Sequence, residues 1–127
     1  MNRVLLVDDE EAILRLLETI LVMNGFEVSA AASARAALQM LKSNEFNVVM
    51  TDLRMETALA GYDVARAADQ LNPRPLIVLL TASEPHTSDW RISGADALLE
   101  KGTGTLEIPN QLRALLRAHN HRRKSVA

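Results

Sequence analysis

Short apolar runs alternate with helix-like patterns along the whole of this 127-residue chain. Little alternation of polar and apolar residues occurs within Val4–Val7, Asn47–Asp52 and Leu76–Leu80, which is typical of strands buried on both faces of a sheet. Strands that alternate with helices predict a parallel sheet covered by helices on both faces. The five runs are Val4–Val7, Phe26–Ala31, Asn47–Asp52, Leu76–Leu80 and Asp96–Glu100.

Five helices are predicted after these five strands. Gly25 and Pro73 supply stop signals, and Ser33 stands where an N-cap is expected. The helices are indicated by Ile13–Leu21, Ala34–Leu41, Val64–Leu71, a short segment between Pro85 and Ser93, and Ile108–His119. We therefore expect one α/β domain, a doubly wound five-stranded parallel sheet of flavodoxin-like type with strand order 2-1-3-4-5.

Composition excludes several classes of function. The chain has no cysteine, so no disulfide, thiolate metal site or cysteine nucleophile is available. The apolar run before the first acidic cluster, Val4–Val7, is too short for a signal peptide or membrane span, so we expect no export and a cytoplasmic location. A formal charge of −2 gives no general attraction to membranes or nucleic acids. The basic stretch His121–Lys124 is interpreted as a solvated helix end, and no direct nucleic-acid binding is expected.

Polar side chains stand at the carboxyl ends of four of the predicted strands. Asp8 and Asp9 follow the first strand, Asp52 ends the third, Thr81 follows the fourth, and Lys101 follows the fifth. The carboxyl ends of parallel strands form the crevice in which open α/β sheets bind ligands. Adjacent first and third strands, about 5 Å apart, would gather three carboxylates there. These charges repel unless a cation intervenes, and oxygen donors without His or Cys fit Mg²⁺.

This combination favours phosphoryl chemistry. Carboxylate-bound Mg²⁺, the Lys101 ammonium and the Thr81 hydroxyl can each contact a phosphoryl oxygen. Asp52 can then act as a nucleophile and carry an acyl phosphate. The histidines lie away from this edge of the predicted sheet, at His86, His119 and His121.

Each of these residues also has an ordinary structural explanation. Asp52 could begin a turn. The run Asp8–Glu11 could cap a helix and complement its dipole, which stabilises by about 0.3–1 kcal/mol per charge. Thr81 could be a strand-end hydroxyl and Lys101 a solvated charge. Their arrival at one edge of the sheet favours the phosphoryl site.

Four motifs resemble the receiver domains of two-component response regulators. The resemblance runs from about Arg3 to Ala118, and implies a receiver domain in residues 1–120 with a basic tail in residues 121–127. It implies that Asp52 accepts a phosphoryl group from a sensor histidine kinase or a histidine phosphotransfer protein, with Thr81 and Lys101 binding the phosphoryl oxygens. The motifs are Leu5–Glu10, Val49–Met55, Leu80–Ala82 and Gly94–Lys101.

The resemblance also implies a set of Mg²⁺ ligands and an output surface. Asp9 and Asp52 would bind the ion directly, Asp8 would act through water, and Arg54 would contribute its backbone carbonyl. Movement of Thr81 toward the phosphoryl group would then change a partner-binding surface made of the fourth helix, the fifth strand and the fifth helix.

The sequence departs from the family pattern at three places. Leu98 occupies the position of an aromatic residue that usually turns inward on activation. Gly102 follows Lys101 where proline in a cis peptide is common, and a cis bond before glycine is disfavoured by about 2.5–4 kcal/mol. The loop Met55–Gly61 lacks the usual proline after methionine and is one residue longer. We expect altered switching and loop shape with the phosphorylation chemistry retained.

Two classes of function fit the acidic edge. One is a signalling module that is phosphorylated about once per chain and relays phosphate or binds a partner. The alternative is a small Mg²⁺-dependent phosphotransferase or phosphatase with an aspartyl-phosphate intermediate, which would need a substrate pocket or cap domain. We favour the signalling module, either as a stand-alone protein or as part of a longer regulator.

Overall fold

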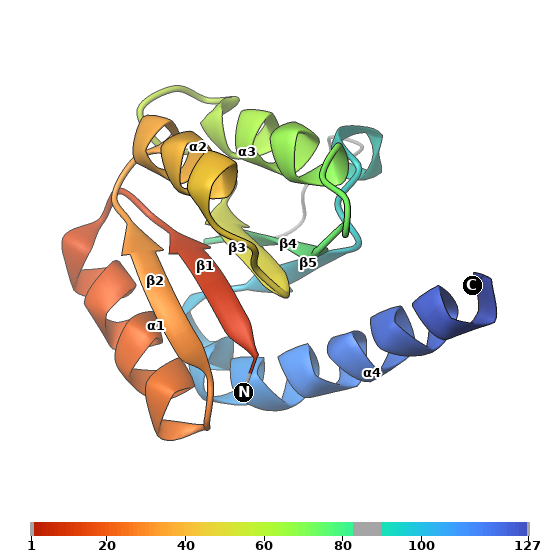
Figure 1. Cartoon of the computed structure of the whole chain (residues 1–127). Helices are drawn as coiled ribbons and strands as arrows, with labels where there is room; N and C mark the ends of the chain where they lie inside the picture. Colours follow the sequence, from red (N-terminus) through yellow and green to blue (C-terminus); the bar gives the residue numbers. More distant parts are fainter. Residues whose placement is uncertain (1, 83–89, 127) are drawn as a thin grey trace.

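The five apolar runs pair side by side as a parallel sheet in the computed structural model, which describes residues 2–82 and 90–126 (Figure 1). The strand order is β2-β1-β3-β4-β5, which confirms the predicted order. The strands are β1 (Arg3–Val7), β2 (Glu27–Ala31), β3 (Val48–Asp52), β4 (Leu76–Thr81) and β5 (Ala97–Glu100). The helices are α1 (Glu11–Met23), α2 (Ala34–Ser43), α3 (Ala60–Asp69), α4 (Ile108–Val126) and the 3₁₀ helices η1 (Trp90–Ser93) and η2 (Gly102–Glu107).

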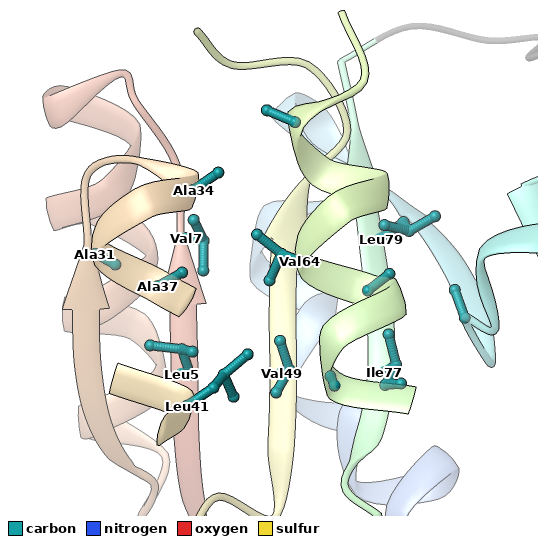
Figure 2. Close-up of a cluster of buried hydrophobic side chains, with 14 of the residues drawn as sticks. Leu5, Val7, Ala31, Ala34, Ala37, Leu41, Val49, Val64, Ile77 and Leu79 are labelled. Atoms are coloured by element: carbon teal, nitrogen blue, oxygen red, sulfur yellow. The ribbon is translucent and has the colours of Figure 1, made fainter. Parts of the chain in front are cut away.

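The three central strands, β1, β3 and β4, bury side chains on both faces of the sheet, because successive residues of a strand point in opposite directions. The edge strands β2 and β5 are mostly half-buried. Leu5, Val49 and Ile77 belong to the hydrophobic cluster beneath α2 and α3, part of which Figure 2 shows. Leu6 and Met50 belong to the second cluster, beneath α1 and α4. Helices thus cover both faces, and the carboxyl ends of the strands remain as the edge on which a site can form.

The prediction of five helices is corrected by the structure, because the described residues contain four α-helices. The predicted helix between Pro85 and Ser93 falls mainly on residues 83–89, which lie outside the described residues. Its described end, Trp90–Ser93, is a single 3₁₀ turn that stops before Gly94, whose φ is 92°. A φ of this sign ends a right-handed helix and is readily adopted by glycine.

Helix α4 is longer than its buried face requires. Ile108, Leu112, Leu116 and His119 are buried, as their helical spacing predicts, and Pro109 lies in the first turn, where a missing N–H does not interrupt the helix. The helix then continues to Val126 and extends away from the sheet (Figure 1). The predicted boundary between residues 120 and 121 therefore falls inside a continuous helix.

Within the described residues, each helix is too short or too polar to cross a membrane.

Candidate functional site

Three carboxylates meet at the carboxyl ends of β1 and β3, as the sequence predicts. The pairing of Val7 with Thr51 places Asp8, just after β1, beside Asp52, the last residue of β3. Asp8 is fully buried and Asp52 is 7% exposed, whereas Asp9 is exposed. One carboxylate oxygen from each aspartate lies within 4.8 Å of the other two. This edge of the sheet therefore concentrates negative charge in a largely desolvated place.

Lys101 brings a positive charge to the same point. Its backbone N–H donates to the Thr81 carbonyl oxygen (2.8 Å), which fixes the residue beside the end of β4. Its Nζ lies 3.0 Å from Asp8 Oδ2 and 3.3 Å from Asp52 Oδ2. The ammonium group is buried with the two carboxylates, so the three charges interact with little screening by solvent.

Burial and neighbouring charges shift the pKa values of two groups at this edge. Burial raises the pKa of Asp52, and the charge of Asp8 raises it further, while the positive charge of Lys101 opposes the shift. Burial acts to lower the pKa of Lys101, but the hydrogen bonds and charges of Asp8 and Asp52 together outweigh burial and raise it. Lys101 thus stays charged without fully compensating the carboxylates, and a second cation would relieve the repulsion.

A cavity of about 230 Å³ opens over this cluster. Thr81 is 5% exposed and lies at the end of β4, on the cavity wall. Arg54 is exposed and also borders the cavity. The lining consists of Glu10, Asp52, Leu53, Arg54, Thr81, Ala82 and Lys101. Asp52 and Lys101 are therefore accessible from one shared space that Thr81 also borders.

The donor set at this edge suits a hard divalent cation. Carboxylate oxygens are preferred Mg²⁺ ligands, and the described residues place no His or Cys in the cluster. Asp8 also accepts a hydrogen bond at Oδ1 from the Glu10 N–H (2.9 Å), so one of its oxygens is occupied by the backbone and the other by Lys101.

Gly61 is a site residue that the sequence interpretation did not single out. Its N–H donates to the Leu53 carbonyl oxygen (3.2 Å), which packs the start of α3 against the residue after Asp52. A Cβ at this position would collide with the backbone carbonyl oxygens of Asp52 and Leu53. The sequence feature that could have identified Gly61 is its position in the first turn of the helix after the acidic strand end. A close approach of two backbone segments at such a position requires glycine.

The departures from the family pattern have visible structural counterparts. Leu98 is partly buried and packs against the cluster beneath α2 and α3. The Lys101–Gly102 peptide bond is trans, and Gly102 has a φ of 81°, which a proline ring cannot adopt. The carboxylate of Glu56, in the longer loop, accepts hydrogen bonds from the Ala34 N–H. No pattern in the sequence indicated this contact between residues 22 positions apart.

The histidines lie away from the cluster where the structure describes them. His119 is buried, and its Nε2 lies 3.2 Å from the Arg74 carbonyl oxygen, before the start of β4 and thus at the other end of that strand. His121 is exposed near the end of α4. His86 lies outside the described residues.

Comparison with curated proteins finds relatives among gene regulators. The chain is 35% identical over 120 residues to a probable transcriptional regulator, ycf27, of Porphyridium aerugineum. It is 32% identical over 118 residues to the transcriptional regulatory protein SrrA of Staphylococcus aureus. Both matches cover 91% of this chain and 48% of the relative. The chain thus spans about half the length of these relatives.

Solved receiver domains share the fold along nearly their whole length. The response regulator TrrA of Thermotoga maritima, solved in complex with Mg²⁺-BeF, is 29% identical, has a TM-score of 0.79, and is matched over 91% of this chain and 99% of its own. A CheY-like receiver domain of Methanospirillum hungatei is 25% identical, with a TM-score of 0.85 and coverage of 96% and 98%. The sequence profile of the response regulator receiver domain matches residues 4–113. With its fold, its acidic edge and this match, the chain belongs to the response regulator receiver domain family.

Proposed function

We propose that Asp52 is the phosphoryl acceptor of this receiver domain. The observation that carries the proposal is the meeting of Asp52 with Asp8, Asp9 and Lys101 at one cavity. The family is a signalling family, which favours this function over the alternative of a metabolite phosphatase. The donor is a phosphohistidine of a sensor kinase or a histidine phosphotransfer protein.

In the transfer step a carboxylate oxygen of Asp52 attacks the phosphorus atom of the donor. The new O–P bond makes an acyl phosphate, and the N–P bond to the donor imidazole breaks in line with it. The electron pair of that bond returns to the imidazole nitrogen. Lys101 contacts Asp8 and Asp52 and is proposed to bind one phosphoryl oxygen, and the Thr81 hydroxyl, which borders the same cavity, is proposed to bind another.

Asp9 and Asp52 would hold Mg²⁺ directly, with Asp8 acting through water and the Arg54 carbonyl as a further ligand. When bound, the ion supplies charge neutralisation for the phosphoryl oxygens. The chain itself keeps the site dry and aligned, because Asp8 and Asp52 are buried and the start of α3 packs against the Asp52 backbone through Gly61. TrrA with its Mg²⁺-BeF supports this assignment by likeness.

Phosphorylation would bias an equilibrium between two states of the domain. Thr81 ends β4 and shares a backbone hydrogen bond with Lys101, so movement of Thr81 would reach β5 and the start of η2. The surface that we propose for the output partner is formed by η1, β5 and α4. Regulation of transcription, suggested by the names of the relatives, would be an activity of a whole protein about twice as long. A cytoplasmic location and the lack of direct nucleic-acid binding stay predictions.

The proposal is tested by labelling with acetyl phosphate. In Mg²⁺ we expect the intact mass of the chain to rise by one phosphoryl group, and hydroxylamine to remove it because acyl phosphates are attacked by that nucleophile. EDTA should prevent labelling. Asp52→Ala should abolish it, while Asp63→Ala, at an exposed carboxylate of α3, should label like the wild type.

Two outcomes would contradict the assignment. Labelling that survives in Asp52→Ala would move the nucleophile to another residue. Continuous release of phosphate from a phosphorylated metabolite, with no stoichiometric label, would favour the enzyme over the signalling module.

A further inference from the structure

The loop between β3 and α3 (residues 53–59) is attached to a neighbouring helix by one acidic side chain. Glu56 Oε2 and Oε1 lie 3.0 Å and 3.3 Å from the backbone nitrogen of Ala34, the first residue of α2. The first N–H groups of a helix have no partner inside the helix and favour a negative charge nearby. The Glu56 carboxylate meets both needs, although its residue is otherwise exposed.

The tip of this loop makes few other hydrogen bonds, although Met55 packs against the hydrophobic cluster beneath α2 and α3. Its base is anchored where the Leu53 N–H donates to Leu80 O (2.9 Å) and Leu53 O accepts from Gly61. Within the tip, the Met55 N–H donates to Thr57 O (3.1 Å). In the part of the chain that the structure describes, the bond from Glu56 is the hydrogen bond that joins residues 54–59 to an element outside the loop and α3.

The helix end that receives Glu56 is itself attached to the acidic cluster. The Asp8 N–H donates to the carbonyl oxygen of Ala31, the last residue of β2 (3.1 Å), and α2 begins three residues later. The β2–α2 turn (Ala31–Ala34) therefore holds Asp8 on one side and, through Glu56, the loop after Asp52 on the other. Both sides of the proposed ion site are connected to the same short turn.

We propose that Glu56 is a positioning residue for the metal site, which holds the Arg54 carbonyl in place by attaching the loop to α2. This inference rests on the proposed function and extends it to a residue outside the acidic cluster. Glu56 stands where the resemblance leads one to expect a proline. The side-chain bond to α2 restrains a loop that lacks the restraint of that ring.

A matched pair of variants separates positioning from stability. Glu56→Ala removes the bond from the loop to α2. Ser33→Ala removes another bond to the same helix end, because Ser33 Oγ accepts from the Ala36 N–H (3.1 Å), but it leaves the loop attached. The dissociation constant of Mg²⁺ is measured by calorimetry without any phosphodonor. We expect Glu56→Ala to weaken Mg²⁺ binding by about tenfold. The dissociation constant of Ser33→Ala should stay close to the wild-type value.

A third variant tests whether the carboxylate acts through its hydrogen bond or through its charge. Glu56→Gln keeps an acceptor oxygen at the same reach, so its Mg²⁺ dissociation constant should lie closer to the wild-type value than that of Glu56→Ala. Equal losses in the two Glu56 variants would overturn the proposed bond in favour of a charge effect.

Hydrogen exchange gives a readout that needs no ion. The Met55 amide should exchange faster in Glu56→Ala than in Ser33→Ala, while the Gly61 amide at the loop base should be unchanged. A wild-type chain that binds no Mg²⁺ would overturn the proposed function. Wild-type Mg²⁺ affinity that persists in Glu56→Ala, or is lost equally in Ser33→Ala, would overturn this inference alone.

Discussion

Two clusters of charged side chains lie at opposite ends of the sheet, and each joins one cation to two carboxylates. Before β4, Arg74 Nε lies 2.8 Å from Asp69 Oδ1, and Arg74 Nη1 lies 3.1 Å from Asp96 Oδ2. At the other end of the strands, Lys101 pairs with Asp8 and Asp52. The two clusters have similar charges and distances, but they differ in how completely each charge is satisfied.

In the Arg74 cluster the charged groups are paired with one another and with backbone groups. The guanidinium also donates to the carbonyl oxygens of Gly94 and Pro75, and Asp96 Oδ2 accepts from the Ile77 N–H (2.8 Å). Burial acts to lower the pKa of Arg74, but the hydrogen bonds to Asp69 and Asp96 outweigh it and raise the pKa. The cluster ties α3 to the starts of β4 and β5, and it needs no further ligand.

The Lys101 cluster is unsatisfied by comparison, since the third carboxylate of Asp9 shares the space and the pKa of Asp52 is raised by burial. One lysine therefore faces more negative charge than it neutralises. Similar ion pairs can thus serve as a structural clamp at one end of a sheet and as an incomplete site at the other. The difference lies in the number of carboxylates and the depth of burial, and four predictions test it.

The largest effect is expected when the clamp is broken. Arg74→Ala leaves two carboxylates facing each other and should lower the free energy of unfolding by about 2 kcal/mol, below the range for a fully buried pair because these side chains keep some solvent contact. Urea denaturation measures the change. Arg66→Ala, which breaks an exposed pair with Asp63, is the control and should cost less than about 1 kcal/mol. Equal losses would remove the distinction between a clamp and a surface pair.

A smaller effect is expected when Mg²⁺ completes the unsatisfied cluster. An ion that binds only the folded chain stabilises it by about 1.4 kcal/mol at ten times its dissociation constant. The melting temperature of the wild type should therefore rise with Mg²⁺, and that of Arg74→Ala should rise by a similar step from a lower start. A melting temperature that does not change with Mg²⁺ would mean that the Lys101 cluster does not bind a second cation.

The smallest and most diagnostic effect is expected when an aspartate is replaced by asparagine in each of the two clusters. Asp96→Asn removes a charge from the Arg74 cluster and should destabilise the chain by about 1 kcal/mol. Asp52→Asn removes a buried charge whose pKa is raised, and should stabilise the metal-free chain at neutral pH. Urea denaturation of both variants gives the signs, and the same sign in both would show that the two clusters do not differ.

The gain in Asp52→Asn should depend on pH in a defined direction. The folded-state pKa of Asp52 lies above the unfolded value of 3.8, so below that value both states are protonated and the gain is absent. As the pH rises, residue 52 loses its proton first in the unfolded wild-type chain. The free energy of unfolding of the wild type therefore decreases relative to that of the variant until the pH passes the folded-state pKa. A gain that shrinks with rising pH in this range would contradict the raised pKa.

The sequence predicted the strands and the convergence of the site because these follow from local patterns. Val4–Val7 and Leu76–Leu80 are short apolar runs, which favours strands in the interior of a sheet. In a parallel sheet the polar residues that follow such strands share an edge. The order of the strands fixed the neighbours of Asp52 without knowledge of any side-chain contact.

Contacts that depend on loop geometry were beyond that reasoning. The bond from Glu56 to Ala34 and the clamp around Arg74 join residues whose spacing in the chain has no period. The number of helices was wrong for a related reason, since only Trp90–Ser93 of the fourth predicted helix is described and it forms a 3₁₀ turn. Apolar periodicity predicts which face is buried, and it says little about which polar groups meet at a turn.

The length of α4 has a mechanical consequence. Its buried face ends near His119, and the helix continues to Val126 beyond the sheet (Figure 1). Nineteen residues of helix span about 28 Å, so a tilt of about 10° at the packed end would displace the far end by about 5 Å. A small rotation of α4 at its first turn, close to Lys101, would therefore produce a larger displacement at the far end of the helix.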